Sequence, residues 1–190
     1  MPVPAAVAPP PPPPPPPPVA REAIAVELRP RVVHISGTEA VLEFELELTN
    51  TQAVSAEGIR ISLGLISANP AQDAWVGTFH AAPTVQPAAD PFTLRPGQAW
   101  RTGGRLQLPM AQLHVVKVGG RPMFVPLLMI DLKWRGGLSL KRQGADFMIG
   151  TAGQGGKLGP IWLDRRQHSG LAANRYVAPP VKDAVEKRSA

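Results

Sequence analysis

The chain has no cysteine. Disulfide bonds, thiolate metal sites and cysteine nucleophiles are therefore excluded, whereas the redox compartment stays open. Aromatic residues make up only 5% of the sequence, so valine, leucine and isoleucine must form most of any core. The longest apolar run, residues 123–130, contains Pro126 and is far shorter than the roughly 20 residues that span a bilayer. The sequence as written therefore predicts a soluble protein.

The N-terminal segment also lacks a secretory signal, which needs a basic start and an apolar run of about 7–15 residues. Residues 1–20 instead hold 12 of the 24 prolines, ten of them consecutive from Pro9 to Pro18. Such a run adopts polyproline II, so residues 1–21 are predicted to be a semi-rigid linker. Because a spacer separates a domain from something, we hypothesise that the natural chain begins upstream with a membrane anchor. A ligand for SH3-type or WW-type grooves is the alternative.

The net charge of +6 is distributed unevenly. Residues 21–131 carry nine Lys/Arg and ten Asp/Glu, whereas residues 132–190 carry eleven Lys/Arg and only four Asp/Glu. This basic third can attract a nucleic acid, an anionic membrane surface or an acidic protein. A solvated, partly disordered end of the chain is the alternative interpretation.

Residues 39–65 indicate the class of fold. Successive side chains of residues 41–48 alternate between two faces. The apolar, or dry, face carries Leu42, Phe44, Leu46 and Leu48, and the solvent-exposed, or wet, face carries Glu43, Glu45 and Glu47. After a turn-rich break, Ile59, Ile61, Leu63 and Leu65 repeat the pattern. Alternation with period two is typical of half-buried strands, and the break predicts that the two strands form an antiparallel pair. In that hairpin Arg60 would pair with the acidic face.

Further segments alternate or are short and apolar, and few show helical periodicity. The predicted additional strands are residues 24–35 with a bend at Pro30, 75–79, 100–108, 115–118, 123–134 and 138–149. About seven short strands separated by turns are typical of a two-sheet β-sandwich. We therefore predict an all-β, antiparallel β-sandwich, with a disordered Pro-rich N-terminus and a flexible C-terminal tail.

Two short motifs carry a family resemblance. Residues 47–51 (Glu-Leu-Thr-Asn-Thr), followed by residues 56–61, and residues 94–108 with their Pro-Gly-Gln turn resemble bacterial immunoglobulin-like domains of the cell-adhesion-related type. The resemblance covers residues 22–150. The paired cysteines and the corner tyrosine of antibody-type domains are missing, since Tyr176 is the only tyrosine. The resemblance implies a sandwich used for spacing or binding, and it implies no catalytic residues.

Three patterns that suggest chemistry fail on closer inspection. Residues 150–160 are glycine-rich, but Thr151 and Leu158 occupy positions where a phosphate-binding P-loop needs glycine and Ser or Thr. The four histidines, His34, His80, His114 and His168, stand singly without metal-ligand spacing. Asp164, His168 and Ser169 contain the residue types of a hydrolase triad, yet they crowd into six positions without a nucleophile elbow. We therefore predict no enzyme, no cofactor, no metal site and no small-molecule substrate.

One basic patch remains as a candidate site. It consists of Lys157, Arg165, Arg166 and Arg175, together with Lys141 and Arg142, and Trp162 and Tyr176 lie among them in the sequence. Phosphate groups bind to such donors, and aromatic rings stack on bases. The patch predicts anion binding, with lipid head groups or nucleic acid as the ligand.

The predicted organisation has four parts. Residues 1–21 form the linker, 22–150 the immunoglobulin-like sandwich, 151–176 a Gly-rich basic strap, and 177–190 a disordered tail. The favoured function is that of a non-catalytic binding or structural module with an unknown protein partner, tethered to a bacterial membrane through its proline stalk. The alternative is anion binding by the basic C-terminal third.

Overall fold

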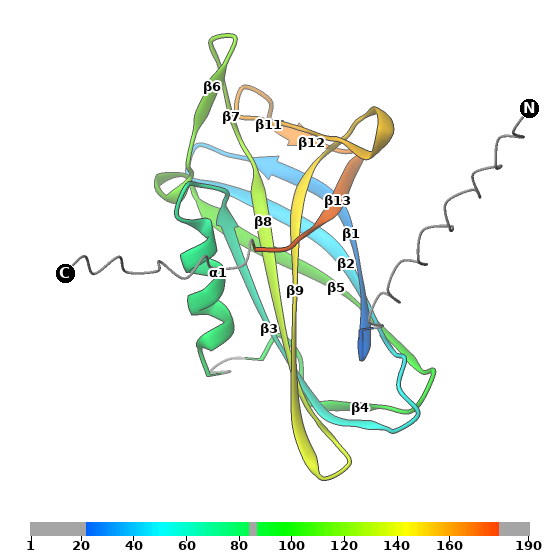
Figure 1. The fold of residues 1–190 in the computed structure, drawn as a ribbon. Helices are drawn as coiled ribbons and strands as arrows, with labels where there is room; N and C mark the ends of the chain where they lie inside the picture. The colour runs from blue at the N-terminus through cyan, green and yellow to red at the C-terminus, as the bar shows by residue number, and fades with distance from the viewer. Residues whose placement is uncertain (1–21, 84–86, 179–190) are drawn as a thin grey trace, which may run out of the picture.

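The computed structural model describes residues 22–83 and 87–178. The described part of the chain is mostly β-structure, with one α-helix and antiparallel sheets (Figure 1). The all-β prediction is confirmed. The predicted polyproline linker and most of the predicted C-terminal tail lie outside the described residues.

The first sheet, sheet A, has the strand order β12-β1-β2-β5. Its members are β1 (Ile24–Ile35), β2 (Glu39–Asn50), β5 (Ala99–Pro109) and the short β12 (Gln167–His168). A register shift between Pro30 and Val32 bends β1 where it pairs with β2. The predicted bend at Pro30 is confirmed, because proline cannot donate a hydrogen bond to a ladder.

The second sheet, sheet B, has the order β10-β9-β8-β3-β4, and β13 also pairs with β9. Its members are β3 (Ala56–Ser67), β4 (Phe92–Leu94), β8 (Pro126–Gly136), β9 (Ser139–Ala152), β10 (Leu158–Gly159) and β13 (Leu171–Tyr176). A small third sheet joins β6 (Val116–Val118), β7 (Arg121–Phe124) and β11 (Ile161–Trp162). Residues 151–176, predicted to be a strap, thus add strands to all three sheets.

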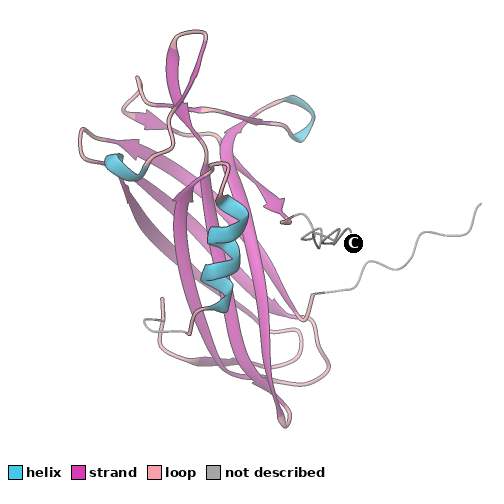
Figure 2. Cartoon of the chain, turned by 60° about the vertical axis from the view of Figure 1, so that its left-hand side comes forward, coloured by secondary structure: helices cyan, strands magenta, loops and turns pink. Residues whose placement is uncertain are grey.

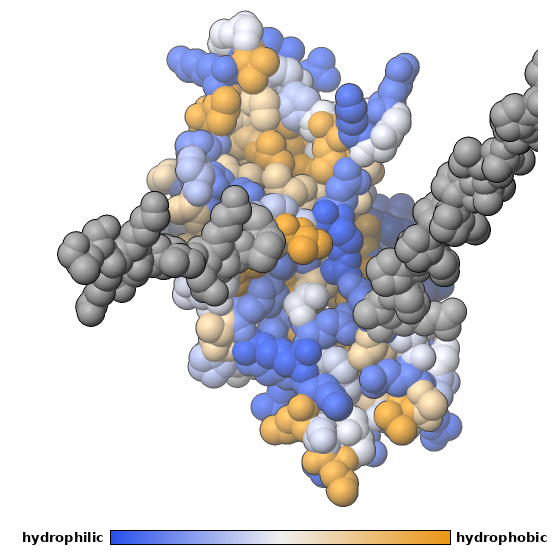
Figure 3. All heavy atoms as spheres, viewed as in Figure 1, coloured by the Kyte–Doolittle hydropathy of each residue, from blue (hydrophilic) through white to orange (hydrophobic). Residues whose placement is uncertain are grey.

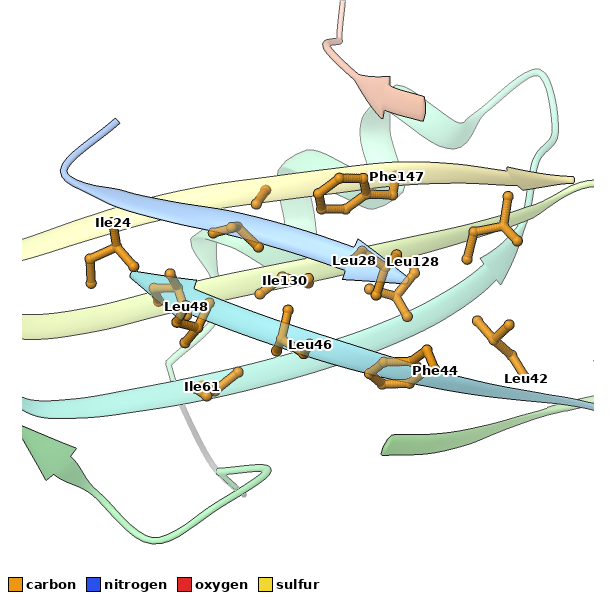
Figure 4. Packing of buried hydrophobic residues seen from close by; sticks show 14 of the residues in the cluster. Ile24, Leu28, Leu42, Phe44, Leu46, Leu48, Ile61, Leu128, Ile130 and Phe147 are labelled. Atoms are coloured by element: carbon orange, nitrogen blue, oxygen red, sulfur yellow. The ribbon is translucent and has the colours of Figure 1, made fainter. Parts of the chain in front are cut away.

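One hydrophobic core lies between sheets A and B (Figure 4). On β2, Leu42, Phe44, Leu46 and Leu48 are at most 2% exposed. On sheet B, Ile61, Leu128 and Ile130 are equally buried. The predicted dry face of residues 41–48 is therefore confirmed.

The predicted hairpin between β2 and β3 is wrong. Strand β2 pairs with β1 and β5, whereas β3 pairs with β8 and β4, so the two strands belong to different sheets. Asn50 fixes the crossing, because its buried amide donates to the carbonyl oxygens of Val54 and Leu94 and accepts from the Gln52 N–H. Two apolar faces can be buried by facing each other across a core as well as side by side, and alternation alone does not distinguish these arrangements. The predicted contact of Arg60 with the acidic face is consequently absent.

The predicted strand at residues 75–79 is also wrong, because this segment lies in helix α1 (Gln72–Ala81). The carbonyl oxygen of Asn69 accepts from the Gln72 N–H and its side chain from the Ala71 N–H, which starts the helical turn. Val76 and Phe79 then pack on Leu127 and Met129, on the outer face of β8 (Figure 2). Five residues are too few for periodicity to separate a strand from a helix.

The predicted strand 123–134 is divided in two. Residues up to Phe124 belong to β7 in the third sheet, and β8 starts at Pro126, opposite Ser67. Proline is tolerated at the first residue of a strand, so β8 can occupy the centre of sheet B despite Pro126.

No helix within residues 22–83 and 87–178 has the length and apolar character to cross a bilayer.

Replacing Phe44 by aspartate should unfold the protein, because the change places an unpaired charge in the core. Glu45→Lys is the matched control on the neighbouring position. Glu45 and its ion-pair partner Arg31 have exposed side chains, so the control should lower the free energy of unfolding by no more than about 1 kcal/mol. Urea unfolding followed by circular dichroism measures both. Equal losses would show that the assigned register is wrong.

Candidate anion-binding groove

A row of three cations crosses the outer face of sheet B. Arg60 on β3 lies opposite Lys133 on β8, and Lys133 lies opposite Arg142 on β9. Residues directly opposite on neighbouring strands point to the same face, with Cβ atoms about 4.5–5.5 Å apart. Like charges in such positions repel each other. The row is therefore a feature that strand pairing alone does not favour.

A buried carboxylate holds two of these cations. Asp131 is 2% exposed and accepts from Arg142 through both oxygens, with Nε–Oδ1 and Nη2–Oδ2 distances of 2.7 and 3.1 Å. The Lys133 ammonium lies 3.6 Å from Asp131 Oδ2. Both cations also donate to the carbonyl oxygen of Ala82 at the C-terminal end of α1, at 3.1 and 3.0 Å. Lys133 and Arg142 are thus held in place before any ligand binds.

His80 extends this network below the helix. Its Nε2 lies 2.9 Å from Asp146 Oδ1 and its Nδ1 lies 3.5 Å from Asp131 Oδ1. The hydrogen bond with Asp146 raises the pKa of His80 above its ordinary value of 6.5, against the opposing effect of burial. Gly144 makes room for the ring, since a Cβ atom there would lie 2.8 Å from His80 Cε1.

The cation row forms one side of a groove with a volume of about 700 Å³. Its charged lining residues are Arg60, Lys133, Arg135, Lys141, Arg142 and Glu57. Within the described residues, Arg60, Arg135 and Lys141 form no ion pair. Five cations against one lining carboxylate give the groove a positive potential, and three of these cations have free donors.

The Trp134 side chain lines this groove from the core side of sheet B, together with Lys141, which lies directly opposite it on β9. The side chain is 3% exposed, and its Nε1 has no hydrogen-bond partner among the described residues. The ring belongs to the core between the two sheets. Trp134 therefore supports the strand that carries Lys133 and Arg135.

The structure brings only part of the sequence-predicted patch together. Arg165 and Arg166 line a separate pocket that Asp164 also lines, and Lys157 follows the 3₁₀ turn η2 (Gln154–Gly156). Arg175 pairs with Glu22 and lies 4.8 Å from the centre of the Phe147 ring. Anion binding by Lys157, Arg165, Arg166 and Arg175 stays a prediction. Lys141 and Arg142, named in the same patch, lie in the groove.

The residue types of a triad are not assembled at positions 164–169. Asp164 accepts from Arg121 at 2.7 and 2.9 Å, and the Nε2–H of the buried His168 donates to the carbonyl oxygen of Trp162 at 2.8 Å. No group of three or more His, Asp or Glu side chains in the described ranges is arranged to hold a metal ion.

Sequence reasoning missed the cluster of His80, Asp131 and Asp146. These residues come from α1, β8 and β9, and the two aspartates lie 51 and 66 positions after His80 in the sequence. One signal was present, because Asp131, Lys133 and Arg135 alternate with apolar residues along a strand that is otherwise buried on both faces.

Comparisons with family models, curated proteins and solved structures found no match for this chain.

Stability should fall as the pH rises through the raised pKa of His80. The folded state binds this proton more tightly than the unfolded state, so the stabilisation is complete below pH 6.5 and is lost above it. Urea unfolding between pH 5.5 and 8.5 measures the slope. The variant His80→Gln should flatten it, whereas His114→Gln, at an exposed position, should leave it unchanged. An unchanged slope in His80→Gln would contradict this assignment.

Proposed function

We propose that this chain is a non-catalytic binding module with an immunoglobulin-like sandwich fold, and that the groove on the outer face of sheet B binds anionic groups. The cation row Arg60–Lys133–Arg142 carries the proposal. Asp131 compensates Lys133 and Arg142, whereas Arg60 forms no ion pair within the described residues. A bound anion would relieve the repulsion that remains between Arg60 and its neighbours. Arginine side chains suit phosphate in particular, because the planar guanidinium offers two parallel donors.

The outer face of sheet A supplies an internal comparison. There Arg29 pairs with Glu27 and Glu47, and Arg101 lies 2.9 Å from Glu47. The hydrogen bond from Arg101 lowers the pKa of the Glu47 carboxyl. These charges thus neutralise each other, whereas Arg60, Arg135 and the groove-lining Lys141 form no ion pair within the described part of the chain. This contrast favours the groove as the binding surface.

Preorganisation supports the same proposal. Asp131 and the carbonyl oxygen of Ala82 fix Lys133 and Arg142 in the unliganded protein. Side chains that are already ordered lose less conformational entropy when a ligand binds. The groove therefore combines two fixed cations with three free ones.

A protein partner is the second candidate, and Trp75 favours it. This side chain is 59% exposed on α1, beside an apolar hollow of about 460 Å³ that Phe79 and Met129 also line. Exposed tryptophan is frequent among residues that dominate protein interfaces. A photocrosslinker at position 75 in cells should give a specific adduct that a crosslinker at Thr93 does not give. No adduct at position 75 would contradict this candidate.

Neutralising the free cations should weaken anion binding. The probe is inositol hexakisphosphate, a soluble polyanion, titrated by calorimetry in 50 mM NaCl. The triple variant Arg60→Gln, Arg135→Gln, Lys141→Gln should raise its Kd at least tenfold, since three cations that can bind phosphate are removed. Its unfolding midpoint should not fall, since the change also removes like-charge repulsion.

The matched control is the pair Arg165→Gln, Arg166→Gln, which removes exposed cations outside the groove and should leave the Kd within twofold of the wild type. If the control loses affinity and the triple variant does not, the site is the patch predicted from sequence and the groove proposal is wrong. No binding by the wild-type chain would also contradict it.

A further inference from the structure

The hairpin between β8 and β9 ends in a fully exposed leucine. Gly136 pairs with Ser139, so Gly137 and Leu138 form a two-residue turn. Gly137 has a φ of +62°, the left-handed conformation that a type II′ hairpin turn needs at its first central position. Leu138 occupies the second position, where its side chain is fully exposed, and Leu140, two residues further along the chain, is 88% exposed.

The fold does not require these leucines. The second position of such a turn has ordinary negative φ and accepts polar residues. Neither leucine belongs to a core cluster. Single apolar side chains are common on protein surfaces. Two almost fully exposed leucines at one hairpin tip instead indicate an interaction site.

The tip is continuous with the basic groove. Leu140 lies opposite Arg135 and lines the groove itself. The connection between β2 and β3 adds the exposed Val54, since Ala56 pairs with Gly136 at the base of the tip. Figure 3 shows hydrophobic side chains at the end of the molecule formed by this hairpin, with hydrophilic ones over the sheet behind them. Apolar side chains thus lie at the end of the molecule, next to the cations that line the groove.

We propose that this end of the molecule docks on an anionic lipid bilayer, with Leu138 and Leu140 entering the head-group region and the groove cations contacting lipid phosphates. This inference rests on the proposed anion-binding function and names the ligand surface. Basic residues close to a membrane surface are attracted to anionic lipids, and apolar side chains add affinity by burial at the acyl boundary.

Lipid explains the tip better than nucleic acid does. Proteins that bind single strands stack bases on exposed aromatic rings. The one aromatic residue that lines the groove is Trp134, and its ring is 3% exposed. Aliphatic side chains at the tip offer no stacking surface, whereas they suit the acyl chains of a bilayer.

The hairpin of β6 and β7 provides a matched control at the opposite end of the molecule (Figure 1). Val118 near its turn is 51% exposed, and Lys117 beside it is also exposed. The two hairpins cannot both contact one flat bilayer end-on. A change at Val118 therefore tests whether any exposed apolar side chain associates nonspecifically with the bilayer.

The absence of cysteine allows a site-specific test in the full chain. Leu138→Cys and Val118→Cys each accept a single environment-sensitive nitrobenzoxadiazole label. Vesicles of phosphatidylcholine with 40% phosphatidylglycerol should shift the emission of the label at position 138 to the blue and leave the label at 118 unchanged. No shift at 138, or equal shifts at both positions, would overturn the proposal.

Vesicle sedimentation with variants separates this inference from the proposed function. Leu138→Ser, at a residue outside the groove lining, should reduce partitioning onto anionic vesicles at least tenfold and keep the Kd for inositol hexakisphosphate. The control Val118→Ser should keep both. Polyanion binding by the wild type without vesicle binding would overturn the membrane inference and leave the proposed function intact. Tighter binding to a single-stranded oligonucleotide than to vesicles would also overturn it.

Discussion

The ion pair between Asp131 and Arg142 is the interaction on which the candidate site depends. A carboxylate that is 2% exposed is stable only when it is paired and hydrogen-bonded. Arg142 and Lys133 supply that pairing and, through the carbonyl oxygen of Ala82, also hold the end of α1 against the sheet. The same buried charge thus fixes the helix and orients two cations of the groove. Loss of Asp131 would leave these cations opposite each other without compensation.

The outer face of sheet B changes character along its length. Under α1 it is apolar, with Leu127 and Met129 packed beneath Val76. The buried carboxylates follow, then the cation row, and finally the leucines at the tip of the β8–β9 hairpin. Each zone has a physical reason to lie beside the next, because the carboxylates shield the cations from the apolar zone and orient them. On the outer face of sheet A, by contrast, Arg29, Arg31 and Arg101 form ion pairs with glutamates of β1 and β2.

Local patterns in the sequence predicted local structure well. The alternation around Phe44 identified the dry face, and Pro30 marked the irregularity in β1. Pairing across the fold was not predictable in the same way, since the apolar faces of β2 and β3 satisfy burial equally as neighbours or as opposite layers. The groove could be predicted only in part from the sequence. Lys141 and Arg142 are adjacent in the sequence, whereas Arg60 is brought close to them only by the pairing of β3, β8 and β9. His80 became meaningful only once α1 placed it over two aspartates.

Chemical-shift mapping on isotopically labelled protein tests the central claim most directly. Backbone amide signals would be recorded with increasing amounts of nanodiscs containing phosphatidylglycerol. The account predicts that signals broaden or shift first at residues 135–142 and around Arg60, while those of sheet A around Glu47 stay in place. Perturbations confined to residues 157–175, or spread over sheet A, would contradict the assignment of the groove and its tip as the binding surface.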